Sequence, residues 1–243
     1  MIQSIVVAIA AFVAAVIASV TGFGIGSLLT PALAISLGTK LAVAVVSIPH
    51  FVGTAQRFIL LRRYVDRRVV VRFGIASAAG GLAGALLHAR ATSHALAVVF
   101  GVLLLLAGVS ELTGWMTRVR WSRSAAWVAG ALSGALGGLV GNQGGIRSAA
   151  MLGFEVPKQS FVATATAIGL CVDVARVPVY LATQGAEIAG AWRPLVIAIV
   201  CVVIGTAVGA RLLSRVPEWI FRRIVALLLI LLGATMIATG GGA

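Results

Sequence analysis

Residues 141–148 have the sequence GNQGGIRS, a glycine cluster with two amides and one arginine inside an apolar run that extends over 125–156. A second glycine cluster, GFGIGS at 22–27, interrupts the apolar run of 4–38 in the same way. At about 1.5 Å per residue, a helix of about 35 residues would be about 52 Å long, far more than a bilayer core requires. Each long run is therefore predicted to form a broken hairpin, two shorter helices joined by an unwound glycine turn.

The composition around these clusters is typical of a membrane protein. Of the 243 residues, 60% are hydrophobic and only 10% are charged, whereas soluble domains carry about 25% charged residues. The other apolar runs lie at 41–61, 69–88, 93–115, 159–181, 194–210 and 218–239. Because about 20 apolar residues suffice for a crossing, we expect an all-α polytopic membrane protein with eight apolar runs and up to ten helical segments.

Several other classes of protein are excluded. Low charge and high hydrophobicity exclude disorder, and two cysteines, Cys171 and Cys201, both inside apolar runs, exclude a disulfide scaffold. The net charge of +13 is distributed over short gaps between apolar runs, so nucleic-acid binding is not predicted. The sequence has no P-loop, no H-E-x-x-H, no G-x-S-x-G and no zinc-site spacing of its cysteines. It therefore predicts neither an enzyme nor a bound metal or cofactor.

The positive charges indicate how the chain threads the bilayer. Sixteen of the 19 Lys and Arg residues lie at or beyond the ends of apolar runs, and they divide nine against seven if every run crosses once. If each broken run instead returns to its starting side, thirteen share one face and only Lys40, Arg90 and Arg193 share the other. Cytoplasmic loops are enriched in Lys and Arg. We therefore expect a multi-pass protein of the cell inner (plasma) membrane, with cytoplasmic basic loops and both termini external.

An internal repeat relates the two halves of the chain. The coincident residues are Gly22 with Gly141, Gly26 with Gly145 and Arg57 with Arg176 at an offset of 119, then Gly80 with Gly205 and Gly84 with Gly209 at 125. Gly80 and Gly84, and likewise Gly205 and Gly209, have small-xxx-small spacing and are interpreted as helix-packing faces. Each predicted repeat, 1–120 and 121–243, holds one broken hairpin and three transmembrane helices, so the second is inverted relative to the first. Inverted repeats with broken helices are typical of secondary transporters, whose substrate site lies between the repeats near the midplane.

The two glycine tips are the predicted substrate site. An unwound tip leaves N–H groups unpaired at the start of the next half-helix, where the helix dipole favours an anion; a tight packing turn is the alternative. The second tip adds Arg147, a permanent cation whose nearest acid, Glu155, is eight residues away. Intramembrane ionisable residues are functional by default; hydrogen bonds to carbonyls of the opposite hairpin are the alternative. The candidate substrate-binding residues are Gly22, Phe23, Gly24, Gly26, Asn142, Gln143, Gly144, Gly145, Arg147 and Ser148.

A second group of polar residues inside apolar runs could gate or support this site. Its members are Ser47, His50, Arg57, Thr164, Thr166, Asp173 and Arg176. Arg57 could instead snorkel to the cytoplasmic surface, and Arg176 has Asp173 at i−3, which favours a neutral structural pair. Asp173 is the only acid deep within an apolar run and is the candidate proton acceptor. The three hydroxyls could instead hydrogen-bond to the backbone, as is common at helix contacts in lipid.

Three stretches of the chain resemble a known transporter family. They are TGFGIGSLLTPAL at 21–33, GNQGGIRSAAML at 141–152 and FVATATAIGLCVDVARVPVYL at 161–181. Together they resemble the sulfite exporter TauE/SafE family, also called the toluene sulfonate uptake permease family. The resemblance implies an inner-membrane permease for sulfite, sulfonates or related small acids, with glycine motifs at 22–31 and 141–151. Asn142, Gln143 and Arg147 depart from the family's usual glycine-and-proline pattern, which leaves the substrate open.

These observations together predict a secondary transporter that moves a small anion by alternating access at a midplane site. The anion is expected to be sulfite, an organosulfonate or a related oxyanion or carboxylate. A channel-like anion pore and a membrane scaffold without a transport cycle are the alternatives. The sequence leaves open the direction of transport, the participation of a coupling proton or ion, and the formation of a homodimer.

Overall fold

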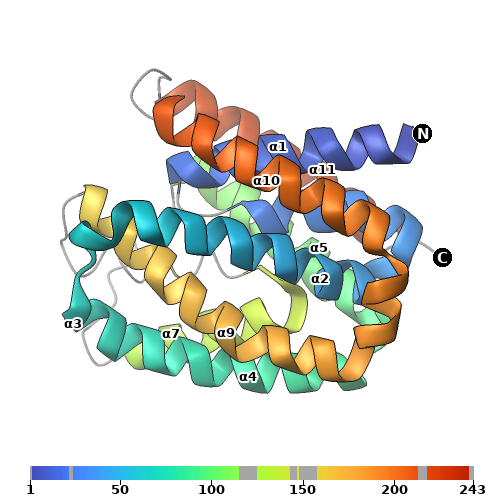
Figure 1. The fold of residues 1–243 in the computed structure, drawn as a ribbon, viewed down its shortest axis with the longest axis horizontal. Coiled ribbons are helices and arrows are strands. Elements are labelled where there is room, and N and C mark those ends of the chain that lie inside the picture. Colours follow the sequence, from blue (N-terminus) through green and yellow to red (C-terminus); the bar gives the residue numbers. More distant parts are fainter. Residues whose placement is uncertain are drawn as a thin grey trace.

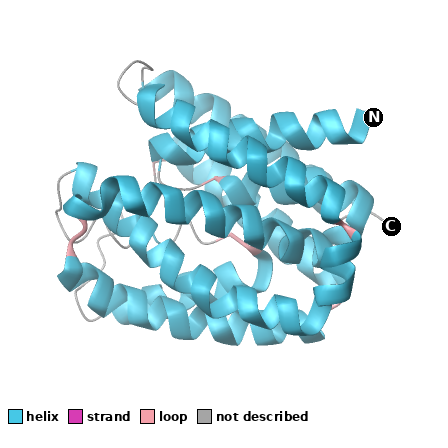
Figure 2. Ribbon diagram, viewed as in Figure 1, coloured by secondary structure: helices cyan, strands magenta, loops and turns pink. Residues whose placement is uncertain are grey.

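The computed structural model describes residues 2–21, 24–114, 125–142, 147, 158–212 and 218–240. Within these ranges the chain forms only helices and short connections (Figure 2). Five of the described helical segments are long and apolar enough to cross a membrane, and three shorter apolar helices accompany them. The predicted fold class, an all-α polytopic membrane protein, is confirmed.

Six of the described helices form three layers, and α5 and α11 pack together as a further pair (Figure 1). The helices before residue 120 are α1 (Ile2–Thr21), α2 (Ile25–Leu61), α3 (Arg67–Val69), α4 (Ile75–Arg90) and α5 (Ser93–Thr113), with a 3-10 turn (Arg62–Tyr64) and a π-helical turn (Val70–Gly74) around α3. The helices after it are α7 (Ala125–Val140), α9 (Lys158–Gly190), α10 (Trp192–Leu212) and α11 (Glu218–Thr239). The middle layer holds α2 and α9, between the pair α1 and α10 on one side and the pair α4 and α7 on the other.

Both long apolar runs break at the predicted glycine clusters. The first helix ends at residue 21 and α2 begins at Ile25, after Gly24 with φ of 134°. The helix α7 ends at Val140, and Gly141 follows with φ of 76°. These positive φ values cost glycine little because it has no Cβ. Apart from Asn142 and Arg147, residues 142–157 lie outside the described part of the chain, so the return of the second hairpin stays a prediction.

The end of the first apolar run is a bend rather than a loop. Residues 25–61 form one element with non-helical angles at Gly38 (φ 70°, ψ 156°). A Cβ on Gly38 would lie 3.2 Å from Ser93 Oγ, and Lys40 Nζ donates to the Ala89 carbonyl at 2.9 Å. The bend is thus fixed against the connection between α4 and α5.

The packing of the helices follows the repeat. The offsets of the repeat make α7 the counterpart of α1 and α4 the counterpart of α10. The packed pair α1–α10 therefore corresponds to the packed pair α7–α4. A Cβ on Gly80 would lie 2.1 Å from the carbonyl oxygen of Ala131, and a Cβ on Gly205 would lie 2.6 Å from that of Phe12. Positions 12 and 131 differ by the offset of 119. The prediction that these glycines are helix-packing faces is confirmed, because a side chain there would meet backbone.

The equivalent helices α5 and α11 run antiparallel. A Cβ on Gly101 would meet Gly233 and Ile237, whereas one on Gly108 would meet Ala226 and Ile230. The contact therefore moves towards the start of α11 as α5 advances, which is the geometry of an inverted repeat. The predicted boundary at residue 120 lies within 115–124, outside the described residues, and stays a prediction.

The two termini lie at the same end of the molecule (Figure 1). Gln3 Nε2 donates to Ser36 Oγ at 2.5 Å, close to the bend at Gly38. The helix α3, with its flanking arginines, lies at the opposite end, where Asp66 caps it by accepting the N–H of Arg68 at 2.8 Å. The end that carries Lys40 is therefore distinct from the end that carries the 62–72 arginines.

Large apolar side chains cover the outside of the bundle. Exposed examples on different helices are Ile9, Ile35, Leu86, Leu106, Val200 and Leu231. Contiguous apolar surface of this kind is rare on soluble monomers and marks an interaction with lipid or with another protein. For helices of this length and composition, the surrounding phase is the bilayer.

Candidate functional site

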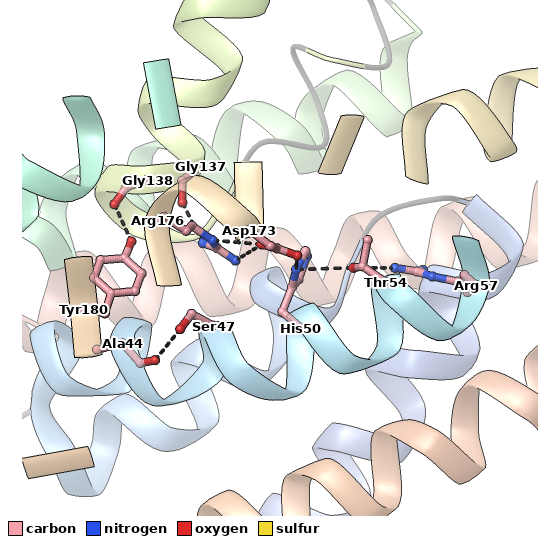
Figure 3. Close-up of polar contacts among 10 residues, drawn as sticks. All are labelled: Ala44, Ser47, His50, Thr54, Arg57, Gly137, Gly138, Asp173, Arg176 and Tyr180. Atoms are coloured by element: carbon pink, nitrogen blue, oxygen red, sulfur yellow. Dashed lines mark hydrogen bonds and ion pairs between the residues drawn. The ribbon is translucent and has the colours of Figure 1, made fainter. Parts of the chain in front are cut away.

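Buried polar side chains gather where α2 crosses α9, the two equivalent helices of the middle layer. Figure 3 shows them in a row that runs from Arg176 to Arg57. Asp173 Oδ1 accepts a hydrogen bond from Arg176 Nε at 2.9 Å and forms an ion pair with Arg176 Nη2 at 2.8 Å. Its Oδ2 lies 2.7 Å from His50 Nδ1. The ion pair expected between Asp173 and Arg176 is thus present, and a histidine from the other repeat joins it.

Each nitrogen of the Arg176 guanidinium lies close to an oxygen. Besides the hydrogen bond and the ion pair with Asp173, Nη1 donates to the Gly137 carbonyl at 2.6 Å. One turn further along α9, the Tyr180 hydroxyl donates to the Gly138 carbonyl. These bonds fix the last turn of α7 just before the second glycine tip, and they give Arg176 a structural role.

The equivalent Arg57 is held far less completely. Its Nη2 donates to Thr54 Oγ1 at 3.3 Å. Its Nε and Nη1 are buried and meet no hydrogen-bond acceptor among the residues that the structure describes. The residue is 3% exposed, so the snorkelling alternative is wrong. Buried guanidinium donors without an acceptor are costly.

Thr54 connects the two arginines through His50. Thr54 Oγ1 lies 3.4 Å from His50 Nδ1, which in turn binds Asp173. A polar chain thus runs from Arg57 through Thr54, His50 and Asp173 to Arg176 (Figure 3). Because Nδ1 faces a carboxylate at hydrogen-bond distance, the ring carries a proton there and Nε2 is the acceptor nitrogen when the ring is neutral.

Arg147, from the second glycine tip, reaches the same crossing. The residue is 3% exposed. A Cβ on Gly169 of α9 would lie 2.9 Å from its Nη1 and 3.6 Å from Cγ2 of Thr54. Its charge interacts with those of Arg57 and Asp173. Three arginines and one aspartate therefore share a buried region between the two repeats.

The two glycine tips contact each other beside this cluster. A Cβ on Gly26 would lie 2.3 Å from the carbonyl oxygen of Gly141. Ser27 Oγ donates to Asn142 Oδ1 at 3.5 Å. A Cβ on Gly141 would in turn lie 3.5 Å from Arg176 Nη1. The structure thus brings together Gly26, Asn142, Arg147 and the charged residues of α2 and α9.

Three of the proposed supporting residues make no hydrogen bond to the charged cluster among the contacts described. Thr164 Oγ1 accepts the N–H of Asp66 at the arginine-rich end. Thr166 and Ser47 donate to carbonyls of their own helices, those of residues 162 and 44. All three hydroxyls bond to the backbone, which was the alternative for them. Gly24 packs against Ile17; Gly22, Phe23, Gln143, Gly144, Gly145 and Ser148 lie outside the described residues.

Two residues of the cluster were not singled out in the sequence, Thr54 and Gly169. The offset of 119 makes Thr54 the counterpart of Asp173 and Gly169 the counterpart of His50. Extending the repeat from the arginine pair by one and two helical turns would have found both. Among the described residues, no group of three or more His, Cys, Asp or Glu side chains is placed to hold a metal ion.

A multi-pass helical membrane protein with a buried cationic cluster between related halves is the class that these features define. The sequence model of the family described as Sulfite exporter TauE/SafE matches residues 7–236, and the chain belongs to this family. No curated protein and no solved structure matches the chain. The family's members are membrane transporters rather than enzymes, and the protein is accordingly a membrane transporter of a small anion.

Proposed function

We propose that this protein is a secondary transporter that binds a small oxyanion between its two glycine tips, at the guanidinium of Arg57. Sulfite, an organosulfonate or a short carboxylate has the required charge and size. The two repeats move against each other and open the site to each side of the membrane in turn, as in other transporters built from inverted repeats.

The observation that carries this proposal is the pair of buried nitrogens, Nε and Nη1, of Arg57. A buried donor left without an acceptor costs about 1–3 kcal/mol, and more when it is charged. The oxygens of an oxyanion would supply the missing acceptors through charge-assisted bonds. Arg176, at the equivalent position, needs no ligand because Asp173 and a carbonyl already accept its bonds.

The surroundings of Arg57 favour an anion over a neutral ligand. Arg147 lies close enough for its positive charge to oppose that of Arg57, and an anion beside both would relieve this repulsion. The N-terminal turn of α2 starts at the buried residues Ile25, Gly26 and Ser27, after a glycine that offers no side-chain cap. The first N–H groups of a helix and its dipole add to the attraction of an anion.

The proposed orientation places the arginine-rich end in the cytoplasm. Cytoplasmic loops carry the excess of Lys and Arg, and the 62–72 arginines lie at the end opposite both termini (Figure 1). Impermeant thiol labelling of cysteines introduced at Gln3 and Tyr64, in a protein without Cys171 and Cys201, tests this orientation. Labelling of position 3 from outside and of position 64 only from inside is expected; the opposite pattern would reverse the orientation.

Counterflow in proteoliposomes tests the function. The purified full chain should exchange labelled sulfite, methanesulfonate or acetate in a saturable way. Arg57→Ala should lower the exchange about 100-fold, because two charge-assisted bonds are worth about 3 kcal/mol. Arg57→Lys should also exchange poorly, because it keeps the charge but loses the planar guanidinium. Arg193→Ala, at an exposed arginine over Trp192, is the matched control and should exchange like the wild type.

Three other results would contradict the proposed site or the proposed transporter function. Exchange by Arg57→Ala at the wild-type rate would show that the anion binds elsewhere. Absence of saturable exchange with every anion would favour a scaffold. Single-channel conductance in a planar bilayer would favour an anion pore.

A further inference from the structure

We propose that Nε2 of His50 binds a proton together with the substrate anion, so that transport is proton-coupled. This inference rests on the proposed function, because it requires an anion at Arg57. The step adds one proton to the lone pair of Nε2 and forms an imidazolium; no other bond forms or breaks. His50 thereby takes the role that the sequence assigned to Asp173.

The hydrogen bonds of the ring select Nε2 as the proton site. Both contacts that the ring makes with described residues are at Nδ1, 2.7 Å from Asp173 and 3.4 Å from Thr54. The carboxylate fixes the proton on Nδ1, so Nε2 of the neutral ring has a free lone pair. The same carboxylate stabilises the imidazolium that protonation of Nε2 creates.

Asp173 is less suited to the exchange of a proton. Its Oδ1 accepts a hydrogen bond from Arg176 Nε and pairs with Nη2, and its Oδ2 faces His50. Protonation would break a buried ion pair that also fixes α7, at a cost of about 3–5 kcal/mol if the pair is lost. Its side chain is fully buried, whereas 9% of the His50 side chain is exposed. A proton can therefore reach the ring while the carboxylate stays enclosed.

The charges that face His50 come from three segments. Asp173 and Arg176 face it from α9, Arg57 lies two turns along its own helix, and Arg147 of the second tip interacts with both Arg57 and Asp173. Among the described residues, α1, α5, α10 and α11, which also pack on α2, add no charged group that acts on His50.

This arrangement makes proton binding and anion binding cooperative. The neutral ring leaves Asp173 and Arg176 as a balanced pair, and the imidazolium adds one positive charge beside Thr54 and Arg57. An anion at Arg57 favours that imidazolium, and by reciprocity the imidazolium favours the anion. Anion affinity is therefore highest at low pH, where Nε2 is protonated. With one proton per anion, it falls about tenfold per pH unit on the alkaline side of this titration.

The experiment uses the full chain in proteoliposomes with the membrane potential clamped at zero. The probe is methanesulfonate, which stays ionised over the pH range, so its own titration adds nothing. An inward pH gradient should drive accumulation of methanesulfonate by the wild type, with one proton taken up per anion. His50→Gln can still donate to Asp173 but cannot titrate; its exchange should match that of the wild type at alkaline pH and should not change with pH, and accumulation and proton uptake should be lost.

His88→Gln is the matched control. His88 is a second buried histidine, whose ring nitrogens bind Leu139 and Gln184; Lys40 and Arg176, and not Arg57, are the charges that act on it. This variant should remain coupled. Accumulation driven by the pH gradient in His50→Gln, with unchanged proton uptake, would overturn the inference. Exchange by the wild type without any proton dependence would also overturn it and would leave the proposed function intact, whereas absence of exchange would overturn the proposed function itself.

Two further measurements keep the test decisive. If only sulfite is exchanged, the same variants are compared with sulfite, whose own titration is common to all of them. If His50→Gln does not fold, the pH dependence of the anion affinity of the wild type tests the inference instead. A tenfold loss per pH unit above the titration of the ring supports the inference, and a constant affinity overturns it.

Discussion

The segments 50–57 of α2 and 169–176 of α9 occupy equivalent positions in the two repeats but carry different chemistry. His50, Thr54 and Arg57 in the first correspond to Gly169, Asp173 and Arg176 in the second. The two segments contact each other symmetrically: position 50 lies against position 173, and their counterparts, positions 169 and 54, also lie against each other. His50 Nδ1 lies 2.7 Å from Asp173 Oδ2, and a Cβ on Gly169 would lie 3.6 Å from Cγ2 of Thr54.

The difference between the segments separates structure from ligand binding. In the second segment an acid neutralises the arginine, and the arginine itself donates to the Gly137 carbonyl of α7. In the first segment threonine replaces the acid, and Arg57 retains two buried donors without an acceptor among the described residues. Glycine in place of histidine in the second segment leaves the space that Arg147 occupies. The two equivalent segments thus hold one arginine whose nitrogens face oxygens, Arg176, and one, Arg57, that we propose binds the anion.

The largest expected effect is that of removing the acid from the second segment. Asp173→Ala leaves Arg176 buried without its counterion and should destabilise the protein by about 3–5 kcal/mol. Thermal or denaturant unfolding in detergent measures this loss. Replacing both members, Asp173→Ala with Arg176→Met, should recover most of the stability. A loss below about 1 kcal/mol for Asp173→Ala would show that the pair is not structural.

The next largest effect should come from placing an aspartate at position 54, which is equivalent to Asp173. Thr54→Asp should neutralise Arg57, because opposite unit charges about 4 Å apart attract by about 4 kcal/mol at an effective dielectric constant of about 20. Anion exchange should therefore fall by up to about 1,000-fold, while the protein stays folded. Thr54→Asn, of similar size and without charge, is the control and should change exchange only a few-fold. Equal exchange by Thr54→Asp and wild type would contradict a ligand role for Arg57.

The smallest effect should follow from filling the space at Gly169. The new methyl group of Gly169→Ala would lie 2.9 Å from Arg147 Nη1, and overpacking costs about 1–3 kcal/mol. The displaced guanidinium should lower exchange about tenfold. Gly185→Ala on the same helix is the control, because no atom lies within 4 Å of its Cβ position. If both variants exchange alike, the position of Arg147 does not matter for transport.

Much of the fold followed from periodicity and composition. The breaks at the two glycine clusters and the packing faces at Gly80 and Gly205 were predictable, because glycine alone tolerates positive φ or contact with backbone at these points. The bend at Gly38 inside one continuous element was not predicted. The pair of Asp173 and Arg176 was predictable because residues at i and i+3 share a helix face.

The rest of the site was not predictable from one helix at a time. Contact between His50 and Asp173 joins residues 123 positions apart, and no local pattern encodes such a distance. The burial of Arg57 also depends on the helices packed around α2, since an isolated helix would let this side chain reach the membrane surface.

The sequence by itself determined that the chain is a helical membrane protein with two related halves, because hydrophobic length and repeated glycines are local properties that a bilayer enforces. Only the tertiary structure decided which arginine is neutralised and which keeps buried donors without an acceptor among the described residues. That decision depends on which acceptors lie within about 3 Å of each buried nitrogen, a property of how α2, α7 and α9 cross.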